Sequence, residues 1–173
     1  AEGKVDPLHF SARLRGSFTP ERRGEQRVGI YSAGFSRVYV DGRLVADAWS
    51  NWTAGRTFFE EGCDEVVGTA MLEAGRAHEV VIEFATKPFA TLGLAAFACG
   101  IGLPLGDEAI AEAVLAARNA DVAVVCIGRN GEWDTEGSDL PDIELPGRQN
   151  ELVAAVANAN PRTVGGLQTG GPG

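Results

Sequence analysis

The spacing of apolar residues changes once along this chain, near Pro104, and this change limits the folds open to it. Before Pro104, short apolar stretches alternate with turn residues. In residues 37–47 (RVYVDGRLVAD), Asp41-Gly42 separates two alternating stretches, which predicts a β-hairpin because a type I′ turn needs positive φ at both central positions. Four further strand-like stretches are HFSARLRGSF (9–18), EQRVGIYS (25–32), VVGTAML (66–72) and HEVVIEFAT (78–86). Such a series predicts an antiparallel β-sandwich.

A helical period replaces this pattern after Pro104. Ile110, Val114 and Ala117 fall on one face of an Ala-, Leu- and Glu-rich segment that Asp107 is placed to cap. The order is a helix over 106–121, a strand over 121–128, a polar loop over 129–146, a second helix over 147–160 and a strand over 162–168. Alternating helices and strands predict an open α/β sheet.

The strand over 121–128 (DVAVVCIG) is a continuous apolar run, which is typical of a parallel strand buried on both faces. We therefore expect the thiol of Cys126 to be buried. In the last strand, Gly165 and Gly166 stand where β-branched residues are usual, and glycine weakens a strand interior.

The predicted fold class is α+β in two domains. An antiparallel β-sandwich occupies residues 1–103, and a partial open α/β lobe with a parallel sheet occupies residues 104–173. Because two strands rarely sustain a sheet alone, we expect residues 104–173 to be poorly packed unless further strands join them.

Charge and composition limit the partners. A net charge of −9 and a pI near 4.7 argue against nucleic acid and anionic membranes, and are compatible with neutral ligands such as sugars. No apolar run approaches the roughly 20 residues that span a bilayer, so a soluble chain is expected. Cys63, Cys99 and Cys126 lack metal-ligand spacing, and no metal or cofactor is predicted. His9 and His78 are expected to have structural or surface roles.

Directly after the apolar strand, the chain gathers carboxylates around a tryptophan in GEWDTEGSD (131–139). The span from Gly131 to Glu144 holds no base and six acids: Glu132, Asp134, Glu136, Asp139, Asp142 and Glu144. A solvated loop is one hypothesis, although Trp133 is costly to expose and Gly137 permits a tight turn. The spacing fails the DxDxDG calcium pattern. A carboxyl group used for proton transfer is the remaining hypothesis, since a glycosidase acid needs a pKa raised by burial or by neighbouring charge.

The stretch ADVAVVCIGRNGEWDTEGSDLPDIELPGRQNELVAAVANANPRTV (120–164) resembles the C-terminal α/β sandwich domain of glycoside hydrolase family 3, the β-glucosidase family. The shared features are the apolar strand, a G-x-W-x-x-E-G-x-D loop, the LPGRQNELV helix start and the ANP-T strand entry. The resemblance extends over about residues 105–170. It implies that Glu136 is the catalytic acid/base. The family usually has an arginine after the Asp of that loop, whereas this chain has Leu140 and lacks an ion pair there that could orient the loop.

The first part of the chain resembles the protective-antigen-type β-sandwich inserted into some family 3 enzymes, from partway through that module. FSARLRGSFTP, SRVYVDGRLVADAW and VVGTAMLEAGRAHEVVIEF carry this likeness. It implies a module that shapes the leaving-group side of the active site. Phe58 and Phe59 are candidate substrate-binding residues, with core or interdomain packing as the alternative. Where sugar-binding relatives hold calcium with adjacent Asp residues, this chain has Ser32-Ala33-Gly34, so no calcium-dependent lectin site is expected.

The resemblance implies a retaining β-glucosidase that hydrolyses terminal β-glucosides and takes its nucleophile, an Asp, from a separate barrel domain. Nothing in these 173 residues matches the nucleophile segment, and a barrel of about 250 residues does not fit in the same chain. The expected partners are a β-glucoside or oligosaccharide substrate and the barrel domain of the same enzyme, so the chain alone is expected to be inactive. The alternative is a carbohydrate-binding or scaffolding module without catalysis.

Overall fold

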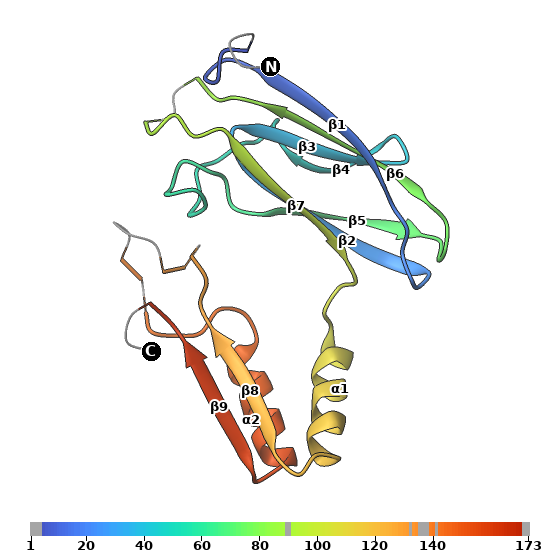
Figure 1. The fold of residues 1–173 in the computed structure, drawn as a ribbon, viewed down its shortest axis with the longest axis vertical. Helices are drawn as coiled ribbons and strands as arrows, with labels where there is room; N and C mark the ends of the chain where they lie inside the picture. The colour runs from blue at the N-terminus through green and yellow to red at the C-terminus, as the bar shows by residue number, and fades with distance from the viewer. Residues whose placement is uncertain (1–4, 89–90, 132, 135–138, 141, 171–173) are drawn as a thin grey trace. The chain divides into compact units, whose positions relative to one another are not determined.

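The computed structural model describes residues 5–88, 91–131, 133–134, 139–140 and 142–170. The chain divides into two compact units, Ala1–Pro104 and Leu105–Gly173. The first consists of antiparallel sheets, and the second contains a small parallel sheet with two helices (Figure 1). The predicted fold class, α+β, is confirmed.

The described residues of the first unit form seven strands. They are β1 (Ser11–Phe18), β2 (Gly24–Ala33), β3 (Phe35–Val40), β4 (Arg43–Ala48), β5 (Val66–Leu72), β6 (His78–Ala85) and β7 (Ala96–Gly102). One sheet has the order β1-β6-β3-β4 and the other the order β5-β2-β7, with antiparallel pairing throughout.

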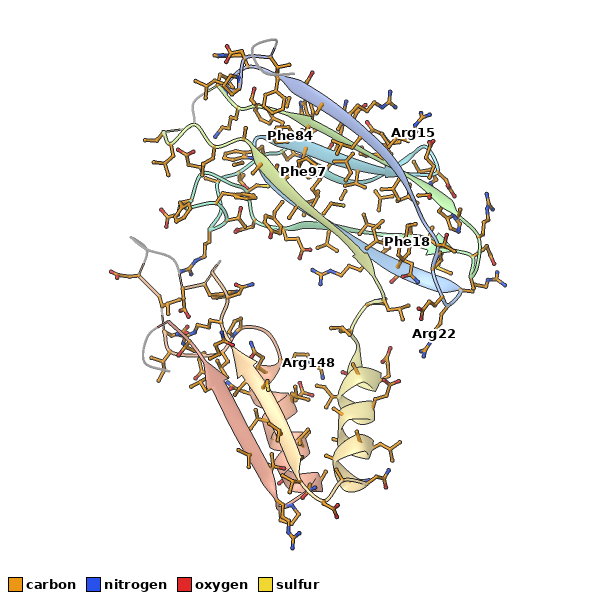
Figure 2. All side chains as sticks on the ribbon, viewed as in Figure 1. Arg15, Phe18, Arg22, Phe84, Phe97 and Arg148 are labelled. Carbon is orange, nitrogen blue, oxygen red and sulfur yellow. The ribbon has the colours of Figure 1, made fainter. Side chains whose placement is uncertain are left out.

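The core of this unit lies between the two sheets. In β3, Ser36, Val38 and Val40 are buried and alternate with half-buried residues, as the period of two in a strand requires. They meet Val28 and Ile30 of β2, which are fully buried. Toward one end of the unit, the rings of Phe84 and Phe97 lie side by side with centroids 5.5 Å apart (Figure 2). Phe84 is on β6 and Phe97 on β7, so this pair joins the two sheets.

The hairpin predicted at Asp41-Gly42 is confirmed. Both residues have positive φ, 48° and 76°, as a primed turn needs. Asp41 also accepts hydrogen bonds from Nδ1 of His78 (2.7 Å) and from the amide of Glu79 (2.9 Å). The buried His78 therefore has the structural role expected from the sequence.

The second unit contains α1 (Asp107–Arg118), β8 (Ala123–Gly128), α2 (Gln149–Ala159) and β9 (Thr163–Gln168). β8 and β9 pair in parallel, from Ala123 opposite Thr163 to Gly128 opposite Gln168 (Figure 1). The order agrees with that predicted from the sequence. No helix among the described residues is long and apolar enough to cross a membrane.

α2 covers one face of this sheet, and α1 packs against α2. Ala117 of α1 and Val156 of α2 pack with Ala123 and Val125, and Leu152 and Val153 join the same cluster, as the helical spacing predicted. On the opposite face, Val124 is 68% exposed and Cys126 is also exposed. The expectation of a strand buried on both faces, with a buried Cys126 thiol, is therefore wrong for this chain. In the described residues, the two-stranded sheet is covered on one face, so alternate residues of β8 stay exposed on the other face.

Two local predictions also need correction. The N-cap of α1 is Gly106, and no side chain caps the helix, so Asp107 begins the first turn instead of capping it. β7 was not expected, because its sequence AFACGIG is poor in β-branched residues. Its place is given by pairing with β2, from Arg27 opposite Gly102 to Ala33 opposite Ala96.

Candidate functional site

The acidic loop leaves the carboxyl end of β8, where ligands commonly bind in open α/β sheets. Glu136, predicted as acid/base, lies outside the described residues, as does Glu132. The structure describes Asp134, Asp139 and the segment 142–146 of this loop. The described part of the loop is therefore its base, next to the ends of β8 and β9.

A cavity of about 690 Å³ lies at this end of the sheet. Its walls include Arg129, Trp133, Pro146, Gln149 and Gln168. The loop, the start of α2 and the end of β9 thus contribute to one hollow. Its lining combines polar side chains with an aromatic ring, as ligand pockets commonly do.

Gln149 fixes the point where the loop begins. Its Oε1 accepts a hydrogen bond from the amide of Gly128 (2.7 Å), and its Nε2 donates to the carbonyls of Gly128 (2.8 Å) and Pro146 (3.0 Å). Gly128 needs to be glycine, because a Cβ there would lie 1.9 Å from the carbonyl oxygen of Gln168. One side chain therefore joins the end of β8, the end of the loop and the first turn of α2.

Arg129, the next residue, is a buried cation. Its side chain is 1% exposed, and Nη2 donates to the carbonyl oxygens of Ile143 (2.6 Å) and, at longer range, Glu144 (3.4 Å). Nη1 lies 3.7 Å from Oδ1 of Asp134, while Nε and Nη1 make no hydrogen bond to the part of the chain that the structure describes. The guanidinium thus contacts both the beginning and the end of the loop.

Asp134 connects the loop to the other strand. Its side chain is 15% exposed, and Oδ2 accepts a hydrogen bond of 2.6 Å from the amide of Gly170, just after β9. One oxygen faces a guanidinium and the other a backbone amide. Asp134 is therefore arranged as a hydrogen-bond acceptor.

A second cation, Arg148, lies at the surface immediately before α2. It forms ion pairs with Asp107 (2.7 Å) and Glu151 (2.6 Å). Its side-chain hydrogen bond lowers the pKa of the Glu151 carboxyl. The side chain of Arg148 is 44% exposed, so solvent screens these pairs, unlike the pair of Arg129 and Asp134.

Phe58 and Phe59, the other predicted site residues, belong to the first unit and have different surroundings. The Phe58 ring packs against Tyr31 with centroids 5.5 Å apart and is half-buried, whereas Phe59 is 63% exposed. Phe58, Phe59 and Glu60 all have positive φ (51°, 56° and 65°). Such a run is unfavourable for residues with a Cβ, and backbone strain of this kind is concentrated at functional sites.

Metal ligands are not gathered in the described residues, where no group of three or more His, Cys, Asp or Glu side chains could hold an ion. Ser32 hydrogen-bonds Ser36 through its hydroxyl (2.7 Å) and is fully buried. Its role in this chain is in the core of the first unit.

The sequence analysis did not identify Arg129, Gln149 or the contacts of Asp134. A signal was present for Arg129, which is the only base between the apolar strand and the second helix start at Gly147 and stands next to six acids. For Gln149 the sequence offers only a polar residue in a helix start. Its contacts depend on a strand end 21 residues earlier.

Known proteins of similar sequence and structure include several β-glucosidases. A β-glucosidase of Rhizobium radiobacter is 47% identical over 98% of this chain, and a probable β-glucosidase J of Aspergillus fumigatus is 40% identical over 94%. The crystal structure of a β-glucosidase from Kluyveromyces marxianus in complex with glucose matches 99% of this chain with a TM-score of 0.87 and 35% identity. The chain spans about a fifth of each of these proteins, 21%, 20% and 21% of their lengths.

The family assignment rests on the greater part of the chain. A family model described as the glycosyl hydrolase family 3 C-terminal domain matches residues 11–173, which includes strands of the first unit and all elements of the second. The chain belongs to glycosyl hydrolase family 3, in the region of its C-terminal domain.

Proposed function

We propose that this chain supplies the acid/base loop of a retaining β-glucosidase, with Glu136 as the acid/base. One observation carries the proposal: an acid-rich loop leaves the carboxyl end of β8 beside a cavity, in a chain 47% identical to a β-glucosidase. The substrate is a terminal β-glucoside or oligosaccharide. The nucleophile comes from the barrel domain of the same enzyme, which acts as this chain's partner.

The chemistry divides between the two domains. Glu136 gives its proton to the glycosidic oxygen as the bond to the sugar carbon breaks, while the nucleophile carboxylate bonds to that carbon. The Glu136 carboxylate then takes a proton from water, whose oxygen attacks the sugar carbon and releases the nucleophile. This division requires carboxyl groups about 5–5.5 Å apart, so the base of the loop has to be rigid.

The aromatic residues of the first unit are proposed to contact the aglycone. Phe59 is the better placed of the two, since it is exposed, while Phe58 anchors the turn by packing on Tyr31. Phe59→Ala should change the preference among aglycones with little effect on inhibition by glucose. Equal effects on aglycone preference and on glucose inhibition would contradict an aglycone role. Phe58→Ala should act mainly on stability.

The test of Glu136 uses the complete enzyme that carries this chain. Glu136→Gln should slow glucosides with poor leaving groups most, because their departure depends on protonation, and external azide should restore the second step. Glu132→Gln and Asp134→Asn provide the comparison. A uniform loss for all leaving groups in Glu136→Gln, without azide rescue, would move the role to Glu132 or Asp134.

The second test uses the chain as it stands. Hydrolysis of 4-nitrophenyl β-D-glucoside by this chain should not exceed that of its Glu136→Gln variant, because no nucleophile is supplied. Activity that disappears in Glu136→Gln would place a nucleophile within the 173 residues and would contradict the need for a barrel.

The alternative of a carbohydrate-binding or scaffolding module has weaker support. Trp49 and Trp52 form an aromatic group with Phe35, with ring centroids 5.9 and 6.4 Å from it. However, the Arg37 guanidinium lies over Trp49 at 4.9 Å and the Lys87 ammonium over Trp52 at 3.4 Å. A sugar would stack on a face of one of these rings, and the two cations already occupy one face of each. Sugar binding that survives deletion of residues 104–173 would favour this alternative.

A further inference from the structure

The acid/base loop has a buried cation at its origin. Arg129 follows directly after β8, its side chain is 1% exposed, and Nε and Nη1 have no hydrogen-bond partner among the described residues. A buried guanidinium needs a compensating charge, because removal of charge from water is costly. Among the described residues, the carboxylate nearest to it is that of Asp134, 3.7 Å from Nη1.

Asp134 in turn holds the loop against the second strand. Its Oδ2 accepts the 2.6 Å hydrogen bond from the amide of Gly170, a residue 36 positions away in the sequence. The approach is close, since a Cβ on Gly170 would lie 3.1 Å from Cβ of Asp134. Arg129 also binds the far end of the loop through the carbonyl oxygen of Ile143 (2.6 Å). Two side chains therefore join the ends of β8 and β9 and both ends of the loop.

We propose that Arg129 and Asp134 are positioning residues for the acid/base of this loop: their ion pair fixes the loop on the strand ends and balances the charge beside Glu136. This inference rests on the function proposed above. Leu140 stands where the family resemblance leads to an arginine, and Arg129 takes the part of the loop-orienting cation in this proposal. Asp134 precedes Glu136 by two residues, so their Cα atoms are at most about 7 Å apart.

The pair predicts opposite electrostatic effects from its two members. A neighbouring negative charge disfavours ionisation of Glu136, and a neighbouring positive charge favours it. Loss of the Asp134 charge should therefore lower the pKa of Glu136, and loss of the Arg129 charge should raise it. For scale, two unit charges 7 Å apart shift one another's pKa by roughly 0.5 to 1.5 units at effective dielectric constants between those of water and a protein surface.

Other charges lie near the loop, and the variants leave them unchanged. Asp139, Asp142 and Glu144 belong to the loop itself, and Glu144 accepts a hydrogen bond from Asn150 (2.7 Å). On the side of α2, Arg148 is neutralised by Asp107 and Glu151.

The experiment measures kcat/KM against pH in the complete enzyme, with a glucoside of poor leaving group. The alkaline limb of this profile reports the group that must be protonated, Glu136 in this proposal. Asp134→Asn should move the limb to lower pH and Arg129→Gln to higher pH, each by roughly 0.5 to 1.5 units. The double variant should bring the limb back toward its original position. General damage to the fold does not produce shifts of opposite sign.

Two further variants separate position from charge. Arg129→Lys keeps the charge but loses the fork that binds the loop carbonyls, and Gly170→Ala displaces Asp134 without changing any charge. Both should leave the alkaline limb in place. Both should lower kcat/KM about tenfold for poor leaving groups, which is a part of the 10²–10⁴-fold that acid catalysis contributes, and less for good ones. Asp107→Asn is the matched control, because it makes the same change in an exposed ion pair of the same unit.

The outcomes distinguish this inference from the function beneath it. If Glu136→Gln shows loss of acid catalysis while Asp134→Asn and Arg129→Gln shift the limb in the same direction or not at all, the positioning pair is wrong and the proposed function stands. If Glu136→Gln lacks that pattern, the proposed function fails first. If Arg129→Gln does not fold, two variants still test the pair. Asp134→Asn removes a charge and should shift the alkaline limb, whereas Gly170→Ala removes no charge and should not shift it.

Discussion

The side-chain amide of Gln149 hydrogen-bonds both backbone polar groups of Gly128, at 2.7 Å to the N–H and 2.8 Å to the carbonyl. The end of a strand is thus held by the first residue of the following helix. This contact lies one residue before Arg129, where the acidic loop begins. Since a rigid strand end limits where the loop can go, stability and catalysis should both depend on Gln149.

Gln149→Leu should destabilise the second unit by about 1–3 kcal/mol, because it leaves the partly buried N–H and C=O of Gly128 without partners. Asn150→Leu is the matched control. It is the next residue of α2 and is exposed, and its side chain bonds only Glu144 in the described residues. Hydrogen exchange of residues 122–127 in the complete enzyme at increasing urea concentration, read by mass spectrometry, measures the difference. Equal destabilisation by both substitutions would contradict a special role for Gln149.

The glycines of the paired strands should respond in opposite ways to substitution. Gly128→Ala places a Cβ 1.9 Å from the carbonyl oxygen of Gln168 and should cost at least about 2 kcal/mol, since the backbone of β9 has to move. At Gly165 a Cβ meets nothing within 4 Å, so Gly165→Val should stabilise by up to about 1 kcal/mol through its strand propensity. Thermal unfolding of the two variants checks the sign. A destabilising Gly165→Val would show that close contacts with further parts of the enzyme require this glycine.

The first unit should lose stability in acid through Asp41. The hydrogen bond from His78, and then that from the amide of Glu79, lowers the pKa of the Asp41 carboxyl. A depressed pKa in the folded state contributes stability that is present above the unfolded value of about 4 and is lost as pH falls through the folded value. Asp41→Asn should remove this contribution and flatten stability against pH below about pH 4.

Fluorescence of Trp49 and Trp52 in a Trp133→Phe background follows the first unit alone during urea unfolding. Glu25→Gln provides a control with the same loss of charge on β2, where none of the described contacts involves its side chain. An unchanged acid dependence in Asp41→Asn would contradict the assignment to this carboxyl.

Protection of backbone amides from hydrogen exchange should differ sharply between β2 of the first unit and β8 of the second. β2 pairs with strands on both sides, and Val28 and Ile30 are 0% exposed. Among the described residues β8 pairs only with β9, and Val124 is 68% exposed. We expect the amides of residues 122–127 in the isolated chain to exchange much faster than those of β2, because a two-stranded sheet opens locally at low cost.

Hydrogen exchange measured by mass spectrometry on this chain and on the complete enzyme provides the comparison. Protection of residues 122–127 should rise in the complete enzyme, while protection of β2 should change little. Strong protection of residues 122–127 in the isolated chain would contradict poor packing of the second unit.

The sequence by itself determined the order of the elements and every element except β7. Asp41-Gly42 specified a hairpin because the turn requires positive φ, and the spacing of Leu152, Val153 and Val156 specified a helix face. These are local effects, encoded by residues within a few positions of one another. The loop motif around Glu136 was likewise visible in the sequence, although its catalytic role remains a prediction.

The tertiary structure decided the features that depend on distant partners. β7 exists because it pairs with β2, despite a sequence with weak strand propensity. Arg129 is buried because the chain returns over it at Ile143, and Asp134 meets Gly170 only because β8 and β9 run in parallel. Periodicity reports which face of an element is apolar, whereas burial and pairing depend on what the rest of the chain places there. For this reason the sequence predicted the acidic loop, and only the structure identified the side chains that hold it.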